Sequence, residues 1–417
     1  MDPQLPDDVI TDILERVPDS ISLFRCSVVC KQWRRLVDDP VFLRRRRWPE
    51  STSQSSLLGF FVQRHRTNFS AQSNINSPNL SPAFVPAPPG DSVLGPGRRL
   101  LSSFVRDDAR ILDKAKPLAA RGGLVLVRVA PRSSEKNNIL RLSVCNLLTG
   151  KLERLPTLDA SLLDGNGVRG YGLIVASDYN DDDDAPQHQR LAHGYSTLFQ
   201  VLLIGFGQDG HLYLFRFSSA VAGSRRWCTY DCKRLTRGEL YGCSNAAIAN
   251  GTARWLFRGN TPTTSSSCFY TLDVSVNTGH ISATIIPLEQ LPHGIRHDWA
   301  NFWLCTVDAK PTLLCLLWNQ QLRIWSQVCQ DGALAWHLTR FIHLDTAEWF
   351  SLACVGENSG TVLALSCFET RYAYVVDLQS GSATKMQGWT SSFNDRTAVP
   401  FEINWPMFFM SRLGVQI

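Results

Sequence analysis

Apolar residues recur at helical spacing near the start of the chain, in the segment LPDDVITDILERV that begins at Leu5. The residues at positions i, i+3, i+4 and i+7 are Ile10, Ile13, Leu14 and Val17. This spacing places the four side chains on one face of a helix. Pro6 and the two aspartates after it stand where a fixed φ angle and negative charge favour a helix start. The pattern predicts an amphipathic helix that ends before Pro18.

Two more short helices are predicted before residue 50. One follows Pro18, and the other covers SVVCKQWRRLV, residues 27–37, with a last turn after Pro40. The residues that share a face in the third helix are Val29, Trp33, Leu36 and Val37. A unit of about 40 residues buries too little surface to be secure alone, and a partner often completes it. We therefore expect residues 1–50 to form a three-helix, all-α domain that docks onto another protein.

The composition changes after this helical unit. Residues 64–99 are rich in Ser, Asn, Pro and Gly, which is typical of loops. The apolar run Leu57–Val62 just before them has the length and composition of a strand. We therefore assign residues 51–99 to a linker that contains a possible first strand.

Residues 100–417 have the pattern of a β domain, in which short apolar runs alternate with turn signals and helical periodicity is scarce. Tight hairpins are predicted at Asp209-Gly210, Asn250-Gly251 and Asp331-Gly332. A second motif consists of an apolar strand, Asn or Asp, and a turn that ends in Gly. It occurs as SVCNLLTGKLERL at 143–155, as YVVDLQSGSATKM at 374–386, and in longer form as YTLDVSVNTGHISAT at 270–284. Each copy predicts a strand, a turn with positive φ at Gly, and a returning strand.

Repeated hairpins without long helices between them are typical of a β-propeller or a β-sandwich. About 300 residues is large for one sandwich and natural for a ring of four-stranded blades. The fold class predicted for the whole chain is thus α+β multidomain, with a small all-α domain followed by an all-β, kelch-like but degenerate β-propeller. We expect its tryptophans to pack between blades, and the repeat is too irregular to give the number of blades.

Composition narrows the classes of function. A net charge of +5 on 417 residues, without a concentrated basic face, does not favour nucleic-acid binding. The start MDPQLPDD lacks the charged and apolar regions of a secretory signal, and no apolar run reaches the length of a membrane helix. We expect an intracellular protein whose twelve cysteines are thiols. Cys228, Cys232 and Cys243 lack a partner pair that would complete a zinc site.

The sequence gives no catalytic, cofactor-binding or metal-binding signature. It contains no G-x-S-x-G elbow, P-loop or H-E-x-x-H motif. His293 and His297 are interpreted as surface histidines, and GFGQDG at 205–210 as a hairpin because a strand follows it. The aspartate-rich stretch 178–190 lacks the alternating ligands, glycine and distal glutamate of an EF-hand. We interpret it as a solvated loop.

The helical segment resembles the F-box of plant F-box proteins. The residues that carry the resemblance are Leu5-Pro6, Asp12-Ile13-Leu14, Val17-Pro18, Val29-Cys30-Lys31, Trp33-Arg34, Asp39-Pro40 and Phe42-Leu43. They follow the order and spacing of the family motif over nearly its whole length. Asp12 stands where the family often has Glu, which is also acidic.

The resemblance implies a non-catalytic substrate receptor of an SCF-type (Skp-cullin-F-box) ubiquitin ligase. In the family, the F-box binds a Skp-type adaptor, and through it cullin and RING subunits, while a second domain binds the target. The residues implied in adaptor binding are Leu5, Pro6, Ile10, Ile13, Leu14, Val17, Val29, Cys30 and Trp33. The expected location is the cytoplasm, the nucleus or both.

The β-rich part resembles more loosely the kelch-like or F-box-associated propellers of plant F-box proteins. The shared features are the run RGGLVLVRV, the Asn-Leu-x-Thr-Gly turn and LERLP. The double glycine of kelch repeats occurs once, as Gly122-Gly123, before a strand.

Two alternatives of other kinds stay open at this point. The β domain could be a small-molecule or glycan-binding module, which an exposed cluster of tryptophans at one end of a ring would favour and buried tryptophans would disfavour. The chain could also bind the adaptor without a role in degradation.

Overall fold

The computed structural model describes two parts of the chain, which we call the head and the body. The head comprises residues 5–17, 20–27, 29–37 and 39–45. The body comprises residues 57–64, 81–88, 100–107, 109–130, 138–175, 178, 198–219, 226–232, 238–260, 267–286, 301–317, 321–330, 333–344, 350–366, 372–390 and 392–403. No helix within these ranges is long and apolar enough to cross a membrane.

The head is all-α, as predicted. Its helices are α1 (Asp7–Glu15), α2 (Ser20–Ser27), α3 (Lys31–Val37) and α4 (Pro40–Arg45). Pro6 precedes α1, which has two aspartates in its first turn. The last turn expected after Pro40 forms the fourth helix, because Asp39 Oδ1 accepts a hydrogen bond from the Val41 N–H at 2.7 Å and so caps it. Helix α3 begins later than expected, since the Val29 N–H bonds to the Cys26 carbonyl in a turn.

Apolar side chains from all four helices lie in the interior of the head. The buried ones are Ile10, Leu14, Leu23, Val37, Phe42 and Leu43. Trp33 and Leu36 of α3 are partly buried and pack against this cluster. On α1, the apolar row that faces the interior of the head is the one that contains Ile10 and Leu14.

The body consists of six larger sheets and one small one. The first blade contains β3 (Lys116–Arg121), β4 (Leu124–Arg128), β6 (Leu142–Asn146) and β7 (Lys151–Arg154); the second contains β9 (Leu163–Val175), β10 (Phe199–Gly207), β11 (Leu212–Ser218) and β12 (Cys228–Asp231). The third contains β13 (Gly238–Leu240), β14 (Ala247–Ala249), β15 (Thr252–Asn260), β16 (Ser267–Ser275) and β17 (Ile281–Ile286). The fourth contains β18 (Asn301–Val307), β19 (Lys310–Leu316), β20 (Gln321–Gln330) and β21 (Ala333–His343); the fifth contains β22 (Phe350–Gly356), β23 (Thr361–Ser366), β24 (Ala373–Asp377) and β25 (Ala383–Lys385).

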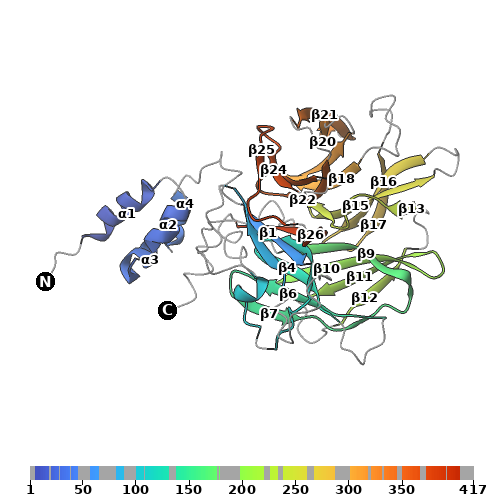
Figure 1. The fold of residues 1–417 in the computed structure, drawn as a ribbon, viewed down its shortest axis with the longest axis horizontal. Helices are drawn as coiled ribbons and strands as arrows, with labels where there is room; N and C mark the ends of the chain where they lie inside the picture. Colours follow the sequence, from blue (N-terminus) through green and yellow to red (C-terminus); the bar gives the residue numbers. More distant parts are fainter. Residues whose placement is uncertain are drawn as a thin grey trace.

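The sixth blade joins the two ends of the body. It contains β1 (Leu57–Arg64), β2 (Ala83–Pro86) and β26 (Phe393–Glu402). Strand β26 pairs antiparallel with β1, for example Phe61 with Val399, although more than three hundred residues separate them in sequence. Figure 1 shows β1 and β26 side by side at opposite ends of the colour scale. The small sheet pairs β5 (Ile139–Leu140) with β8 (Leu158–Asp159), and Leu101–Ser103 form a short 3-10 helix.

The inner strands of the six blades form a closed ring. We call β3, β9, β14, β18, β22 and β26 the inner strands, because each contacts the inner strand of the next blade and β26 contacts both β22 and β3. This ring makes the body a six-bladed, all-β propeller. The predicted fold class is confirmed as a small all-α domain followed by an all-β propeller, with four helices in the head instead of the predicted three, and the sandwich alternative is wrong.

The predicted linker contributes strands to the sixth blade. The strand expected at Leu57–Val62 forms as β1. The loop prediction for residues 64–99 is wrong at Ala83–Pro86, which form β2 and pair with β1. Phe84 and Val85 are both buried, so this strand faces apolar neighbours on two sides. The strand is only four residues long and is surrounded by prolines and serines. Averaged over a longer stretch, the composition is therefore that of a loop.

The predicted turns connect the strands of the blades. Asp209-Gly210 lies between β10 and β11, and Asn250-Gly251 between β14 and β15. In the recurring motif, Asn146 Oδ1 accepts hydrogen bonds from the Leu148 and Thr149 N–H groups, both at 3.0 Å. Asp377 Oδ1 accepts the equivalent bonds at the β24–β25 turn. The glycine of each copy has positive φ, 73° at Gly150, 70° at Gly279 and 79° at Gly381, which only glycine adopts without strain. The Asp331-Gly332 turn lies outside the described residues.

Tryptophan and phenylalanine side chains fill the spaces between blades. Trp255 and Trp325 are fully buried, and Trp336 is nearly so. Trp318, Trp349 and Trp405 lie outside the described residues. No tryptophan in the described ranges is among the exposed large apolar side chains. The expectation that tryptophans pack between blades is therefore confirmed for these three.

Candidate functional site

A row of exposed apolar side chains follows α1 of the head. Leu5, Val9 and Ile13 lie four residues apart, which places them on one side of a helix, and they are 51%, 40% and 42% exposed. Val29, before α3, is 68% exposed, and Val41 of α4 is 44% exposed. Five large apolar side chains in contact with water are many for a unit of this size. Contiguous exposed apolar surface is rare on proteins that act alone.

The structure divides the implied adaptor-binding residues into three groups. Exposed are Leu5, Pro6, Ile13, Val29 and Cys30; partly buried are Val17 and Trp33; fully buried within the head are Ile10 and Leu14. Sequence reasoning grouped Ile10 and Leu14 with Ile13 on one face and did not include Val9. Val9 could have been predicted from the sequence, because it lies four residues from both Leu5 and Ile13. Because α1 carries two apolar rows, the periodicity alone could not show which row lies inward.

Polar contacts attach the start of α1 to α3. Gln32 Nε2 donates hydrogen bonds to Asp7 Oδ1 at 2.8 Å and to the Leu5 carbonyl at 3.3 Å. Arg35 forms an ion pair with Asp7. Arg35 and Asp7 are both well exposed, so the ion pair contributes less than about 1 kcal/mol. These contacts hold Leu5 beside α3, so that Leu5 extends the exposed apolar row of Val9 and Ile13.

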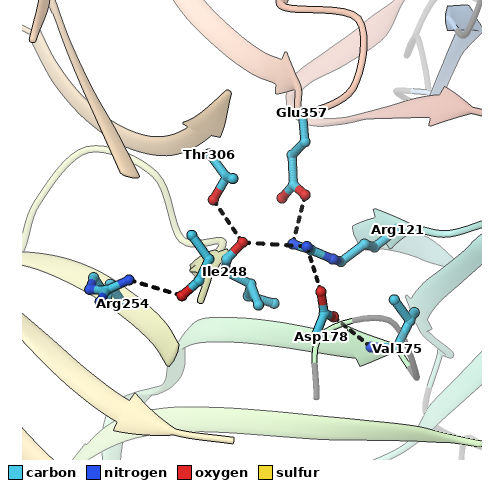
Figure 2. A network of polar contacts seen from close by, with 8 residues as sticks. Arg121, Val175, Asp178, Ile248, Arg254, Thr306 and Glu357 are labelled. Carbon is cyan, nitrogen blue, oxygen red and sulfur yellow. Dashed lines mark hydrogen bonds and ion pairs between the residues drawn. The ribbon is translucent and has the colours of Figure 1, made fainter. Parts of the chain in front are cut away.

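A buried polar network lies where the carboxyl ends of the inner strands meet, and Figure 2 shows it with Arg121 at its centre. Arg121, the last residue of β3, forms ion pairs with Asp178 Oδ1 at 2.7 Å and with Glu357 Oε2 at 2.6 Å. Its Nη2 also donates to the Ile248 carbonyl at 3.3 Å, which accepts a second bond from Thr306 Oγ1 at 3.0 Å. The network connects the first five blades of the ring.

The sixth blade joins the same end through Glu402. Its two carboxylate oxygens accept hydrogen bonds from the Asn358 N–H at 3.0 Å and the Ser359 N–H at 2.8 Å. The turn after β22 is thus fixed to the last residue of β26. Side-chain or main-chain groups from every blade therefore connect at this end of the ring.

Carboxylates outnumber the cation in this network. Burial raises the pKa of Glu357 to about 7, against the attraction of Arg121, and the charges of Asp178 and Glu402 raise it further. Burial also raises the pKa of Asp178, while Arg121 opposes the rise. Asp178 is 8% exposed, so the solvated-loop prediction for 178–190 is wrong at this residue. The remainder of that stretch lies outside the described residues.

A cavity of about 50 Å³ lies within the ring of inner strands. Among the residues that line it are Tyr171, Asn245, Trp303, Cys243, Cys305 and Cys354. Burial raises the pKa of the Cys243 thiol to about 11 and that of Cys305 and Cys354 well above the ordinary value. No group of His, Cys, Asp and Glu in the described part of the chain could hold a metal ion. Ligand pockets typically measure about 300 Å³ or more, so this cavity has room only for water-sized molecules.

Comparison with known proteins assigns the head. Residues 2–49 match the family model described as F-box-like. The head is an F-box-like domain. No curated protein matches the chain.

Several solved structures resemble the chain at low sequence identity. TolB from Acinetobacter baumannii is 9% identical over 83% of this chain and 67% of its own, with a TM-score of 0.43. The Cps50 (Swd1) β-propeller domain from Myceliophteria thermophila is 10% identical over 75% and 82%, with a TM-score of 0.38. A structure titled as a 6-phosphogluconolactonase from Bacteroides fragilis is 12% identical over 82% and 85%, with a TM-score of 0.37. At these scores the fold assignment rests on the strand order and ring closure of the body itself.

Proposed function

We propose that the chain is the non-catalytic substrate receptor of an SCF-type ubiquitin ligase. The F-box-like domain binds a Skp-type adaptor, which connects it to cullin and RING subunits, and the propeller binds a target protein. The observation that carries this proposal is the exposed apolar row of the F-box-like domain. The setting is the cytoplasm or the nucleus, and the propeller is of the kelch-like or F-box-associated kind found in plant F-box proteins.

The adaptor contact is assigned to Leu5, Val9, Ile13 and Val29. Each apolar side chain of this size that becomes fully buried contributes about 1.5–3 kcal/mol. A few such anchors usually supply most of the binding energy of an interface. Ile10 and Leu14 have a different role in this proposal, since they hold α1 on the rest of the domain.

Such a receptor acts by proximity. The F-box-like domain anchors the complex, the propeller holds the target, and a conjugating enzyme within reach modifies lysines of the target. Holding two reactants in one complex raises their effective concentration, and the receptor itself carries out no chemical step.

The proposal is tested by two matched isoleucine substitutions. Ile13→Asp places a carboxylate on the proposed interface, whereas Ile285→Asp makes the same change at an isoleucine of the body that is 63% exposed. Burying an unpaired charge is costly, so Ile13→Asp is expected to weaken adaptor binding by a factor of about 100 or more. Ile285→Asp is expected to bind like wild type. Affinity is measured by titrating the full-length chain with a purified Skp-type adaptor.

Circular dichroism and thermal unfolding of both variants show whether the fold persists. Equal affinity of the two folded variants would contradict the assignment of the interface. Leu14→Asp is less informative, because Leu14 is 0% exposed and its substitution would disrupt the domain itself.

The alternative of a glycan-binding or small-molecule propeller has less support. The fully buried Trp255 and Trp325 belong to hydrophobic clusters and cannot stack on a sugar. The central cavity is also several times smaller than a usual ligand pocket.

A further inference from the structure

Three basic residues lie together at the end of the ring opposite to the Arg121 network. Lys116 is the first residue of β3, and its direct cross-strand partner is Arg128, the last residue of β4. Arg396 lies in the first half of β26, the inner strand that contacts β3 on its other side. Inner strands run in the same direction, so both begin at the same end of the ring. Five residue steps of about 3.3 Å place Lys116 roughly 17 Å from Arg121.

These three cations have no acidic partner in the described part of the chain. None of them forms an ion pair there, in contrast to Arg121 with its two carboxylates. Burial lowers the pKa of Lys116, and the charges of Arg128 and Arg396 lower it further, with no carboxylate that opposes them. Like charges directly opposite each other in a sheet are destabilising. The body therefore holds three positive charges close together at a cost in stability.

The three basic side chains differ in exposure. Lys116 is partly buried, while Arg128 and Arg396 are exposed, so the group extends from the interior to the surface. Arg128 also acts on Tyr171, which lines the cavity: burial raises the pKa of that phenol, and the positive charge of Arg128 opposes the rise.

We propose that Lys116, Arg128 and Arg396 form an anion-binding site at this mouth of the propeller, and that its ligand is a phosphate monoester. Three cations exceed the charge that one carboxylate neutralises, and a phosphate monoester carries about −1.5 to −2 at neutral pH with three acceptor oxygens. Arginine guanidinium groups donate paired hydrogen bonds to such oxygens, and lysine adds a point charge. The phosphate reaches the site on a side chain of a bound protein or on a free small molecule.

The three cations lower the stability of the unliganded protein, which favours a role in binding another molecule over a role in folding. Substituting Lys116 by Met removes the repulsion and keeps the length of the side chain. This variant is therefore expected to unfold at a higher temperature than wild type in the absence of phosphate. A site that served only the stability of the ring would show the reverse.

The site is tested with inorganic phosphate on the full-length chain. At constant ionic strength, phosphate is expected to raise the unfolding temperature of wild type above that in chloride, and acetate is not. Arg396→Gln is expected to lose most of this increase and to bind phosphate about tenfold more weakly by titration. Arg154→Gln, which changes an exposed arginine on the outer strand of the first blade, is the matched control and is expected to respond like wild type.

A short peptide with one phosphoserine and its unphosphorylated twin distinguish the two sources of the phosphate. Tighter binding of the phosphopeptide than of inorganic phosphate assigns the site to a protein ligand, and equal binding assigns it to a small molecule. An equal response of wild type, Arg396→Gln and Arg154→Gln to phosphate would overturn the proposal, as would an equal response to acetate. Adaptor binding by Arg396→Gln is expected to be unchanged, so this test is independent of the proposed role of the F-box-like domain.

Discussion

Glu357 occupies an unusual electrostatic position among the residues of the body. It is paired with Arg121, yet it lies partly buried near two further carboxylates, Asp178 and Glu402, and its pKa rises to about 7. A folded-state pKa above the ordinary value of 4.5 means that the folded protein binds the proton more tightly than the unfolded chain. The contribution to stability is fully present below pH 4.5 and is lost as the pH rises to about 7.

Glu357→Gln is therefore expected to reduce the dependence of stability on pH. Wild type should lose up to about 3 kcal/mol of unfolding free energy between pH 4.5 and 8 through this group. The glutamine variant cannot ionise and should lose less. Urea unfolding at both pH values measures the difference, with Glu239→Gln, a change on the edge strand β13, as the control. Parallel pH profiles for wild type and Glu357→Gln would contradict the interpretation.

Sequence could not reveal this network, because its members are scattered over the chain. Arg121, Asp178 and Glu357 come from three blades and meet only when the ring closes. Asp178 even begins an aspartate-rich stretch whose composition is typical of a solvated loop. Local patterns describe a residue's neighbours in sequence, whereas burial of this aspartate depends on an arginine 57 positions away.

At the scale of single elements, sequence was most informative for the tight turns. A glycine that closes a tight turn signals positive φ, and the glycine has positive φ in all three copies of the recurring motif. The sequence also predicted helix α1, but it did not show which side of the helix faces the interior of the head. The row that contains Ile10 and Leu14 lies inward and the row that contains Val9 lies outward, a choice that depends on tertiary packing.

The turn at Gly210 permits a clean measurement of this effect. Its φ is 76°, and a Cβ added there would meet no atom within 4 Å. Gly210→Ala is therefore expected to cost about 1–2 kcal/mol from backbone strain alone. Gly165→Ala, at a glycine that is equally open but has no positive φ, is expected to change stability by less than about 0.5 kcal/mol. Denaturant unfolding of the two variants compares them, and similar costs would mean that φ is not the cause.

At the scale of the whole molecule, the body is closed by strands from its two ends. Blade number could not be counted from sequence, since one blade is divided between residues 57–86 and 393–402. No local pattern encodes a pairing over that separation. The aromatic side chains at the junction show how it is held: Phe401 of β26 packs against Phe61 at 5.6 Å and Phe104 at 5.9 Å between ring centroids.

Phe401→Ala is expected to destabilise the whole body by about 3–5 kcal/mol, because it leaves a cavity in this junction. Phe341→Ala is the matched control, since Phe341 is 61% exposed whereas Phe401 is 3% exposed. The control should change stability by less than about 0.5 kcal/mol. Chemical denaturation followed by tryptophan fluorescence reports on the blades together. If Phe401→Ala matched the control, closure of the ring through β26 would not govern stability.

The most direct test of the proposed function is a calorimetric titration of the full-length chain with a purified Skp-type adaptor. A one-to-one complex with a dissociation constant below about 1 µM and a negative heat-capacity change is expected, because the exposed apolar row of the F-box-like domain becomes buried. Absence of binding by the folded chain would contradict the receptor role.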